Sequence, residues 1–368
     1  MKILIDINHP AHVHYFKNIV KLLETKGHEF LIISRNKEIE HHLLDAYNIP
    51  FISRGKGQSN LFGKVLYFFK AILILLIHVN RFKPEVIVSF GTPYPAIAGW
   101  LMRRPHISIN DTEHAKAHHL LTDPFSKSIL TPSCYQKDLG EKQIRFDSYM
   151  ELCYLRDNYF TPDPSILDQL DVAKGQEYVI LRFVSWNAAH DVGHSGISLE
   201  MKRKIAKELS NHVRVFISSE SELTEDLKKY QIKIPPEKMH DALYFAALLY
   251  GESSTMASEC ACLGTPSIFL DNDGRGYTDE EEERYGLVFN YSESLLDQTR
   301  SLEKAIDILN TPNREIEFQK RHQKMIDEKI DPTKFIAWFI EQYPMSHQEI
   351  KNNPDLPSRF MDSRWRRF

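Results

Sequence analysis

Residues 250–277 read "YGESSTMASECACLGTPSIFLDNDGRGY" and contain two kinds of element in series. Gly251 is closely followed by hydroxyl side chains, and mostly small residues continue to Gly264. Glycine at both ends of a run of helix-compatible residues predicts a short helix, and "PSIFL" after it predicts a buried strand. A helix that leads directly into a buried strand is typical of a parallel α/β sheet.

The same alternation of strands and helices extends over most of the chain. Strands are expected at residues 2–7, 29–35, 49–53, 84–91, 105–111, 177–183, 213–219 and 266–270. Helices are expected at residues 14–26, 61–79, 94–102, 199–210, 222–230 and 240–249, with one more ending at residue 47. A stretch rich in Pro and Asp, residues 157–176, divides the pattern and looks like a linker. We therefore predict two α/β domains, residues 1–160 and 161–335, a C-terminal helix and tail at 336–368, and a cleft between the domains.

The composition excludes some classes of function. The chain has 368 residues, a net charge of -4 and 26% charged residues, so it lacks the basic excess of a nucleic-acid-binding protein. Its four cysteines show neither a CxxC pair nor a zinc-ligand spacing. The first ten residues turn polar too early for a signal peptide. We expect a cytoplasmic protein without nucleic-acid partners.

The most apolar stretch is residues 61–79, interrupted by Lys64 and Lys70. We expect a helix buried in the N-terminal domain and no transmembrane segment. The alternative is a surface helix that dips into lipid, with Arg54, Lys56 and the aromatic, Arg-rich residues 358–368 at its rim. That alternative implies peripheral contact with the inner face of the cell membrane and a lipid-linked acceptor.

The start of the helix after Gly251 has the features of an anion site. Ser253, Ser254 and Thr255 can cap its N–H groups, and the helix dipole favours negative charge there. Glu259 lies about one turn further on the same face, the step from a diphosphate to a ribose. The alternative is a buried helix with a Ser cap and a solvated Glu. The GxxxxGK[ST] pattern of P-loop proteins is absent from the sequence.

Other polar residues follow the predicted strands, where open α/β sheets bind ligands. In the first half, His9, His12 and His14 are expected to cluster in the loop after the first strand. His9, His12, Asp111 and Glu113 are candidates for acid–base chemistry. The alternatives are a metal site at the histidines, phosphate contact and a structural role.

In the second half, Arg182 can neutralise a diphosphate, Trp186 can cover a base or pack internally, and Glu220 lies after the next strand. Asp273 lies in the sequence "DNDG" (residues 271–274), and Arg275 follows directly. We expect this loop to touch the donor sugar. Although this loop invites comparison with a metal-binding DxD motif, we expect no metal site and no separate cofactor.

The segment "SSTMASECACLGTPSIFL" resembles the nucleotide-sugar signature of the GT-B superfamily. This superfamily includes the lipid-II-forming N-acetylglucosaminyltransferase and the non-hydrolysing UDP-N-acetylglucosamine 2-epimerases. "NHPAHVHYF" is similar to the transferase's GGHVxP loop at His12 and Val13, but has Pro10 and Ala11 in place of the two glycines. Residues 1–335 also resemble an uncharacterised family of GT-B-like proteins.

The resemblance implies a GT-B fold of two Rossmann-like domains, acceptor-side first and nucleotide-sugar-binding second. It also implies that the Ser/Thr run holds a diphosphate and that Glu259 holds a ribose. The expected function is metal-independent transfer of a sugar from a nucleotide-activated, UDP-linked donor to a cell-envelope or other glycan acceptor. Two alternatives remain, a UDP-N-acetylhexosamine 2-epimerase and a non-enzymatic nucleotide-sugar-binding protein.

Overall fold

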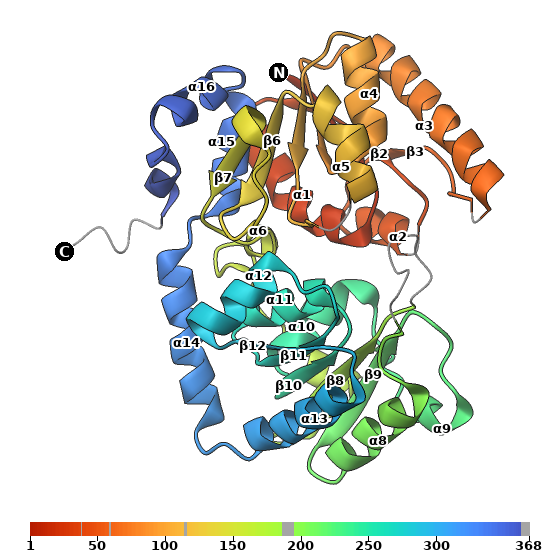
Figure 1. Cartoon of the computed structure of the whole chain (residues 1–368), viewed down its shortest axis with the longest axis vertical. Helices are drawn as coiled ribbons and strands as arrows, with labels where there is room; N and C mark the ends of the chain where they lie inside the picture. Colours follow the sequence, from red (N-terminus) through yellow and green to blue (C-terminus); the bar gives the residue numbers. More distant parts are fainter. Residues whose placement is uncertain (38, 59, 114–115, 186–194, 362–368) are drawn as a thin grey trace. The chain divides into compact units, whose positions relative to one another are not determined.

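The computed structural model describes the whole chain except residues 38, 59, 114–115, 186–194 and 362–368. The chain forms two compact units (Figure 1). Unit 1 comprises residues 1–154 and 329–368, and unit 2 comprises residues 155–328. The predicted linker at 157–176 therefore lies within unit 2, where the side chain of Ile166 is fully buried.

Unit 1 is built on a seven-stranded sheet in the order β3-β2-β1-β4-β5-β6-β7. All of its strand pairs are parallel. The strands are β1 (Lys2–Ile7), β2 (Glu29–Ser34), β3 (Phe51–Ser53), β4 (Val86–Phe90), β5 (His106–Ile109), β6 (Ser128–Pro132) and β7 (Gln143–Phe146). The helices are α1 (Pro10–Glu24), α2 (Glu40–Ala46), α3 (Leu61–Phe82), α4 (Pro93–Leu101), α5 (Lys116–Thr122), α15 (Pro332–Glu341) and α16 (Met345–Asn352), with short 3₁₀ turns η1 (Asp123–Phe125), η2 (Gly140–Lys142) and η5 (Leu356–Phe360).

Unit 2 is built on a five-stranded parallel sheet in the order β12-β11-β10-β8-β9. The strands are β8 (Tyr178–Phe183), β9 (Arg214–Ser219), β10 (Leu248–Gly251), β11 (Ser267–Leu270) and β12 (Val288–Tyr291). The helices are α7 (Ile166–Gln169), α8 (Leu199–Ser210), α9 (Glu225–Lys228), α10 (Met239–Tyr244), α11 (Ser254–Leu263), α12 (Gly276–Glu280), α13 (Leu295–Leu309) and α14 (Arg314–Glu328), with η3 (Pro236–Lys238) and the π-helical turn η4 (Glu281–Tyr285). The short helix α6 (Leu152–Leu155) spans the boundary between the units.

The two parallel-sheet α/β domains predicted from the sequence are thus confirmed. The cause is visible in the strands, whose apolar residues are buried on both faces in β1 and β8. Residues 336–368, expected as a separate helix and tail, are part of unit 1 together with residues 329–335, which were expected in the second domain. Helix α15 packs against α1, and α16 packs against β7. Figure 1 shows both helices in blue beside the strands β6 and β7.

The helix predicted at residues 240–249 is wrong in its second half. Helix α10 ends at Tyr244, and Leu248–Gly251 form β10, a fully buried strand between β8 and β11. The continuous apolar run "ALYFAALLY" has no period that separates a helix from a central strand. Strands β6, β7 and β12 were not predicted either.

Candidate functional site

The start of α11 lies at the point where the strand order of unit 2 reverses. Strand β8 comes first in sequence, β9 pairs with one side of it, and β10 pairs with the other. In open parallel sheets, ligands bind outside the carboxyl ends of the strands at this reversal. The two chain segments that leave β8 and β10 there are the loop after Phe183 and the start of α11.

Gly251 ends β10 opposite Arg182 of β8. A Cβ atom on Gly251 would lie 2.1 Å from the carbonyl oxygen of Arg182, closer than non-bonded atoms approach. The glycine therefore permits β10 and β8 to come together at the end from which α11 begins.

The N-terminus of α11 is capped by a hydroxyl, as predicted. Ser253 has an extended backbone, and its Oγ accepts a hydrogen bond from the N–H of Met256 at 3.3 Å. Ser254 and Thr255 occupy the first turn, both half-buried, and that turn contains no acidic residue. A first turn with hydroxyls, free of negative charge and at the positive end of a helix dipole, suits a phosphate group.

Glu259 is buried further along α11, with 5% of its surface exposed, so it is not the solvated Glu of the alternative interpretation. Its Oε1 lies 2.9 Å from Nε2 of His240 in α10. His240 was not singled out in the sequence, because its position 19 residues earlier gives no local signal of the contact.

Arg182 projects from β8 and is engaged by two residues of the neighbouring strand end. Its guanidinium donates to Oγ of Ser218 at 3.0 Å and forms an ion pair with Glu220. The other oxygen of Glu220 accepts from the N–H of Ser185 at 3.1 Å. The predicted residues Arg182 and Glu220 are thus brought together as a pair, and Glu220 also holds the first residues of the loop after β8.

Two buried carboxylates that the sequence analysis missed hold the ends of that loop. Glu252 accepts from the N–H groups of Val184 at 3.0 Å and Ile197 at 2.5 Å. Glu293 accepts from the N–H groups of Ser195 and Gly196, both at 2.7 Å. Trp186, predicted to cover a base or to pack internally, is outside the described residues.

The loop after β11 is organised by an internal ion pair. Arg275 lies 3.2 Å from a carboxylate oxygen of Asp271, whose other oxygen accepts from the N–H of Asp273 at 2.8 Å. Asp273 itself is exposed, and Arg275 is half-buried. Asp271, the first acid of the DxD-like sequence, is therefore neutralised by a residue of its own loop.

In unit 1, the predicted loop containing His9, His12 and His14 is wrong. Helix α1 already begins at Pro10, whose fixed φ suits the first helical position, and Nδ1 of His9 caps it by accepting from the N–H of Ala11 at 3.2 Å. His12 and His14 are therefore helical and buried. Pro10 and Ala11 therefore belong to the first turn of a helix and not to a glycine-rich loop.

His12 nevertheless lies at the reversal of strand order in unit 1, between β1 and β4. Its Nδ1 accepts from the N–H of Asn8 at 3.4 Å, and its ring lies 4.7 Å from that of Phe90 at the end of β4. The ring centroids of His9 and His12 are 5.8 Å apart. The two histidines are thus neighbours at a strand-end position suited to ligand contact.

Asp111 and Glu113 follow β5, as predicted, but they have different surroundings. Asp111 is buried, with its Oδ1 accepting from the hydroxyl of Thr112 at 2.8 Å. Glu113 is half-buried and accepts from the N–H of Gln136 at 3.2 Å. Their catalytic roles stay predictions.

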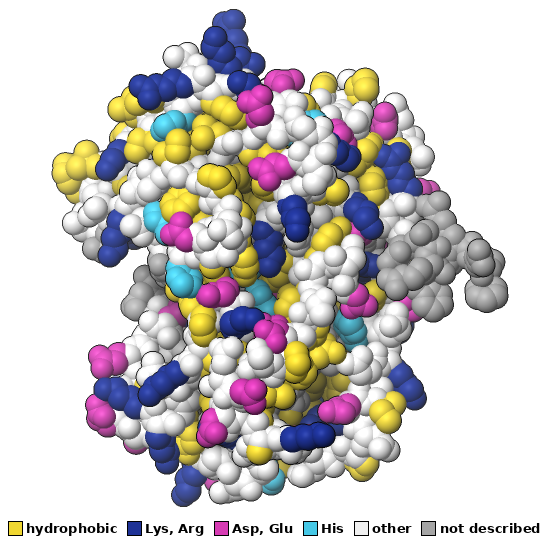
Figure 2. Space-filling model, turned by 180° about the vertical axis from the view of Figure 1, so that it is seen from behind, with side chains coloured by type: hydrophobic (Ala, Val, Ile, Leu, Met, Phe, Trp, Pro, Cys, Tyr) yellow, Lys and Arg dark blue, Asp and Glu magenta, His cyan; other side chains and the backbone are white. Residues whose placement is uncertain are grey.

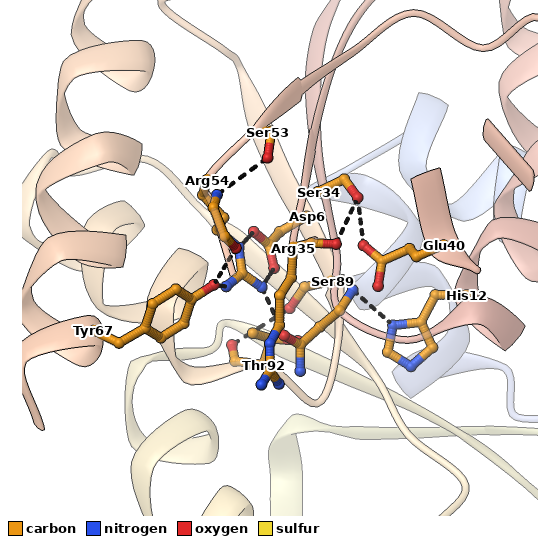
Figure 3. Close-up of polar contacts among 12 residues, drawn as sticks. Asp6, His12, Ser34, Arg35, Glu40, Ser53, Arg54, Tyr67, Ser89 and Thr92 are labelled. Carbon is orange, nitrogen blue, oxygen red and sulfur yellow. Dashed lines mark hydrogen bonds and ion pairs between the residues drawn. The ribbon is translucent and has the colours of Figure 1, made fainter. Parts of the chain in front are cut away.

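A buried polar cluster at the carboxyl ends of β1 to β3 was missed by the sequence analysis (Figure 3). Arg54 has no exposed surface, so its placement at the rim of a lipid-contacting helix is wrong. It donates from Nε and a terminal nitrogen to the two oxygens of Asp6, at 3.0 and 3.1 Å. It also donates to Asn8 at 2.8 Å and to the hydroxyl of Tyr67. The aromatic ring of Tyr94 lies 4.8 Å from its guanidinium carbon. This paired ion holds the ends of β1 and β3 and two helices, α3 and α4, in one arrangement.

Glu40 lies at the edge of this cluster and has no exposed surface. The hydroxyl of Ser34 donates to its Oε1, whereas Oε2 is buried without a partner among the described residues. Burial raises the pKa of Glu40 to about 7, since a charged carboxylate loses its hydration there.

The described residues contain no group of three or more His, Cys, Asp or Glu side chains arranged to hold a metal ion. His190 and His194, which have the spacing of helical metal ligands, lie outside the described part of the chain.

Residues 1–343 match the family model described as proteins of unknown function, DUF354. The chain belongs to this family. An uncharacterized protein of Methanocaldococcus jannaschii is 26% identical over 280 residues, which cover 73% of this chain and 81% of that protein.

Solved structures share the fold at low sequence identity. One of them is the UDP-GlcNAc 2-epimerase of Neisseria meningitidis, bound to UDP-GlcNAc. It has a TM-score of 0.67 and 14% sequence identity to this chain, and the match covers 93% of this chain and 100% of that one. A spinosyn rhamnosyltransferase, in complex with spinosyn aglycone, has a TM-score of 0.58 and 13% identity, over 92% of this chain and 100% of that one. The DUF354 chain therefore has the fold of the GT-B glycosyltransferases and the related epimerases, which confirms the predicted fold class.

Proposed function

We propose that this DUF354 protein is an enzyme that binds a nucleotide-activated sugar, UDP-linked, and transfers the sugar to an acceptor hydroxyl. The observation that carries the proposal is the position of α11. Its hydroxyl-rich first turn, which contains no acidic residue, begins at the reversal of strand order in unit 2, with a buried carboxylate one turn further on. The fold shared with a 2-epimerase bound to UDP-GlcNAc supports the same ligand class.

The proposed roles in unit 2 follow from the chemistry of a nucleoside diphosphate. The N–H groups of the first turn of α11 and the hydroxyls of Ser254 and Thr255 bind the diphosphate. Glu259 accepts hydrogen bonds from the ribose hydroxyls. During transfer, the bond between the anomeric carbon and the diphosphate oxygen breaks, and the helix terminus stabilises the charge that develops on the departing UDP.

The proposed base belongs to unit 1. His12, Asp111 or Glu113 takes the proton of the acceptor hydroxyl as its oxygen bonds to the anomeric carbon. His9 is a weaker candidate in this group, because its Nδ1 accepts the capping hydrogen bond of α1. The acceptor proposed from the sequence is a glycan or lipid-linked precursor of the cell envelope.

Epimerisation at C2 of a UDP-N-acetylhexosamine is the second candidate. It is favoured by the several UDP-GlcNAc 2-epimerases among the structurally similar proteins, including those of Neisseria meningitidis and Methanocaldococcus jannaschii. In that reaction, a base removes the C2 proton as UDP is eliminated, and re-addition of UDP with delivery of a proton to the opposite face of C2 gives the epimer.

Incubation with UDP-GlcNAc alone, followed by NMR, distinguishes the two reactions. A transferase yields no C2 epimer and at most slow hydrolysis, while labelled sugar enters a cell-envelope lipid or glycan fraction once that fraction is added. Appearance of the epimer without acceptor would establish the second candidate. Absence of epimer, transfer and hydrolysis, combined with tight UDP binding, would favour a non-enzymatic binding protein.

The acid–base assignment has its own control. Asp111→Asn and Glu113→Gln are expected to lower turnover while leaving UDP affinity unchanged, because the nucleotide is assigned to unit 2. Glu141→Gln changes an exposed acid of unit 1 and serves as the matched control. Equal turnover in all three variants would exclude both acids as the base.

A further inference from the structure

Helix α3 exposes a continuous apolar stripe, whereas the sequence led us to expect a buried helix. The exposed apolar side chains recur at helical spacing along one face. They are Phe62 (74% exposed), Val65 (48%), Leu66 (55%), Phe69 (65%), Leu73 (58%) and Ile77 (42%). Large apolar side chains concentrated on one exposed helix face indicate an interaction surface, unlike single apolar residues scattered over a protein surface.

The opposite face of α3 is fixed in the core of unit 1. Leu75 and Val79 are buried in one cluster with Leu4 of β1, Ile33 of β2 and Ile87 of β4. By length and composition, Phe62–Phe82 could cross a membrane, and 28% of its most apolar window is buried. Crossing would remove Leu75 and Val79 from the sheet. A helix held in this way can only lie along a surface.

The chain segment that contains the stripe carries one sign of charge. Residues 46–84 contain no Asp or Glu. Their exposed basic residues are Lys56, Lys64, Lys70, Arg81 and Lys83. Figure 2 shows yellow side chains with dark blue ones beside them in the part of unit 1 that contains α3. This one-sided charge is notable in a chain whose overall charge is -4.

The neighbouring helix α4, which packs against α3, adds an aromatic residue of the kind found at membrane interfaces. Trp100 is 59% exposed, and Leu101 next to it is 50% exposed. The tryptophan ring combines a large apolar area with a polar N–H, which suits the boundary between lipid and water.

We infer that the exposed face of α3 docks on a bilayer containing anionic lipids. The apolar stripe lies at the boundary between the headgroups and the acyl chains, and the basic residues lie among the headgroups. The alternative occupant of an apolar face is a second copy of this chain. Two copies meeting through α3 would bring two sets of basic side chains together, with no acid between residues 46 and 84 to pair with them. Anionic headgroups pair with these charges. The inference does not depend on the proposed function.

Co-sedimentation of the full chain with vesicles provides the test. The protein is expected to bind vesicles of phosphatidylcholine with phosphatidylglycerol at low salt, more weakly at high salt, and least to phosphatidylcholine alone. No binding to the anionic vesicles at low salt would overturn the inference.

Substitutions test whether vesicle binding depends on this face of α3 or on nonspecific adsorption of the protein. Phe69→Glu and Leu73→Glu are each expected to lower the partition coefficient by more than about tenfold, because each puts a charge where an apolar side chain enters lipid. Leu295→Glu changes a residue of unit 2 that is 71% exposed and is expected to leave binding unchanged. Circular dichroism checks that each variant is folded, and having two variants of the stripe keeps the test valid if one fails to fold.

Charge reversal tests the role of the basic residues beside the stripe. Lys70→Glu and Arg81→Glu are each expected to weaken binding to anionic vesicles by at least about fivefold, the equivalent of about 1 kcal/mol. Lys204→Glu, on the exposed side of α8, is the control. Equal effects of the rim and control variants would contradict the inference. So would a dimer of the wild-type chain that Phe69→Glu converts to monomer without any change in vesicle binding.

Discussion

Nε2 of His240 lies 2.9 Å from Oε1 of Glu259, and both side chains are almost fully buried. The contact joins α10 to the helix whose N-terminus we assign to the diphosphate. A histidine within hydrogen-bond distance of one carboxylate oxygen fixes the orientation of the group. We infer that His240 positions Glu259 toward the ribose.

A negative charge introduced at the start of α11 is expected to have opposite effects on the stability of the folded protein and on its affinity for UDP. Thr255→Asp is expected to stabilise the folded protein slightly, by about 0.3–1 kcal/mol, because an acid in the first turn favours the helix dipole. The same charge repels a diphosphate, so UDP affinity should fall by more than about tenfold. Thermal unfolding and calorimetric titration with UDP measure the two effects.

Leu295→Asp is the matched control for this variant. It places the same charge at the first position of α13, which also has a Ser cap, at a residue that is 71% exposed. The control should share the effect on stability and leave UDP affinity unchanged. If Thr255→Asp bound UDP as tightly as the wild-type protein, the diphosphate would have to bind elsewhere.

The sequence was most informative where local chemistry decides the structure. The cap at Ser253 and the end of α11 at Gly264, which has φ of 80°, are both consequences of neighbouring residues. By contrast, strand β10 was predicted as helix, because a short apolar run satisfies both patterns and only its position between β8 and β11 decides.

Removal of metal ions is expected to leave nucleotide binding intact. Asp271 already forms an ion pair with Arg275, and the anion site is assigned to a helix N-terminus, which requires no metal. UDP affinity measured with EDTA should therefore equal that measured with magnesium or manganese. A loss of affinity in EDTA that either metal restores would revive the DxD interpretation of "DNDG".

Glu40 predicts a specific dependence of stability on pH. The folded protein, with a pKa of about 7 for this group against an ordinary 4.5, holds a proton that the unfolded chain has lost. Between these values, the free energy of unfolding therefore falls as pH rises, by up to about 3 kcal/mol from this group. Glu40→Gln cannot ionise and should remove that contribution.

Denaturant unfolding of both proteins at about pH 4.5 and pH 8 checks this expectation. The stability of Glu40→Gln relative to wild-type should increase over that interval. Glu141→Gln, an exposed acid in unit 1, controls for the loss of a negative charge. Parallel pH profiles for wild-type and Glu40→Gln would show that folding does not raise the pKa of Glu40.

The parts of the candidate site that the sequence did not reveal depend on distant contacts. Asp6 and Arg54 are 48 residues apart, and Glu252 binds the N–H of Ile197, 55 residues away. No local spacing identifies such partners, since the sheet brings them together only when it is complete. The exposed stripe of α3 was misjudged for a related reason: composition shows that a helix is apolar but not which face the sheet covers.

Calorimetric titration of UDP into wild-type, Glu259→Gln and Glu208→Gln proteins tests the nucleotide-sugar assignment most directly. Glu259→Gln keeps the shape of the side chain and removes its charge, and Glu208→Gln makes the same change on α8, outside the assigned site. We predict that wild-type and Glu208→Gln bind UDP equally and that Glu259→Gln binds it about 1–3 kcal/mol more weakly, the cost of a lost hydrogen bond to a charged group. A folded wild-type protein that does not bind UDP, or equal affinity in all three proteins, would contradict the assignment.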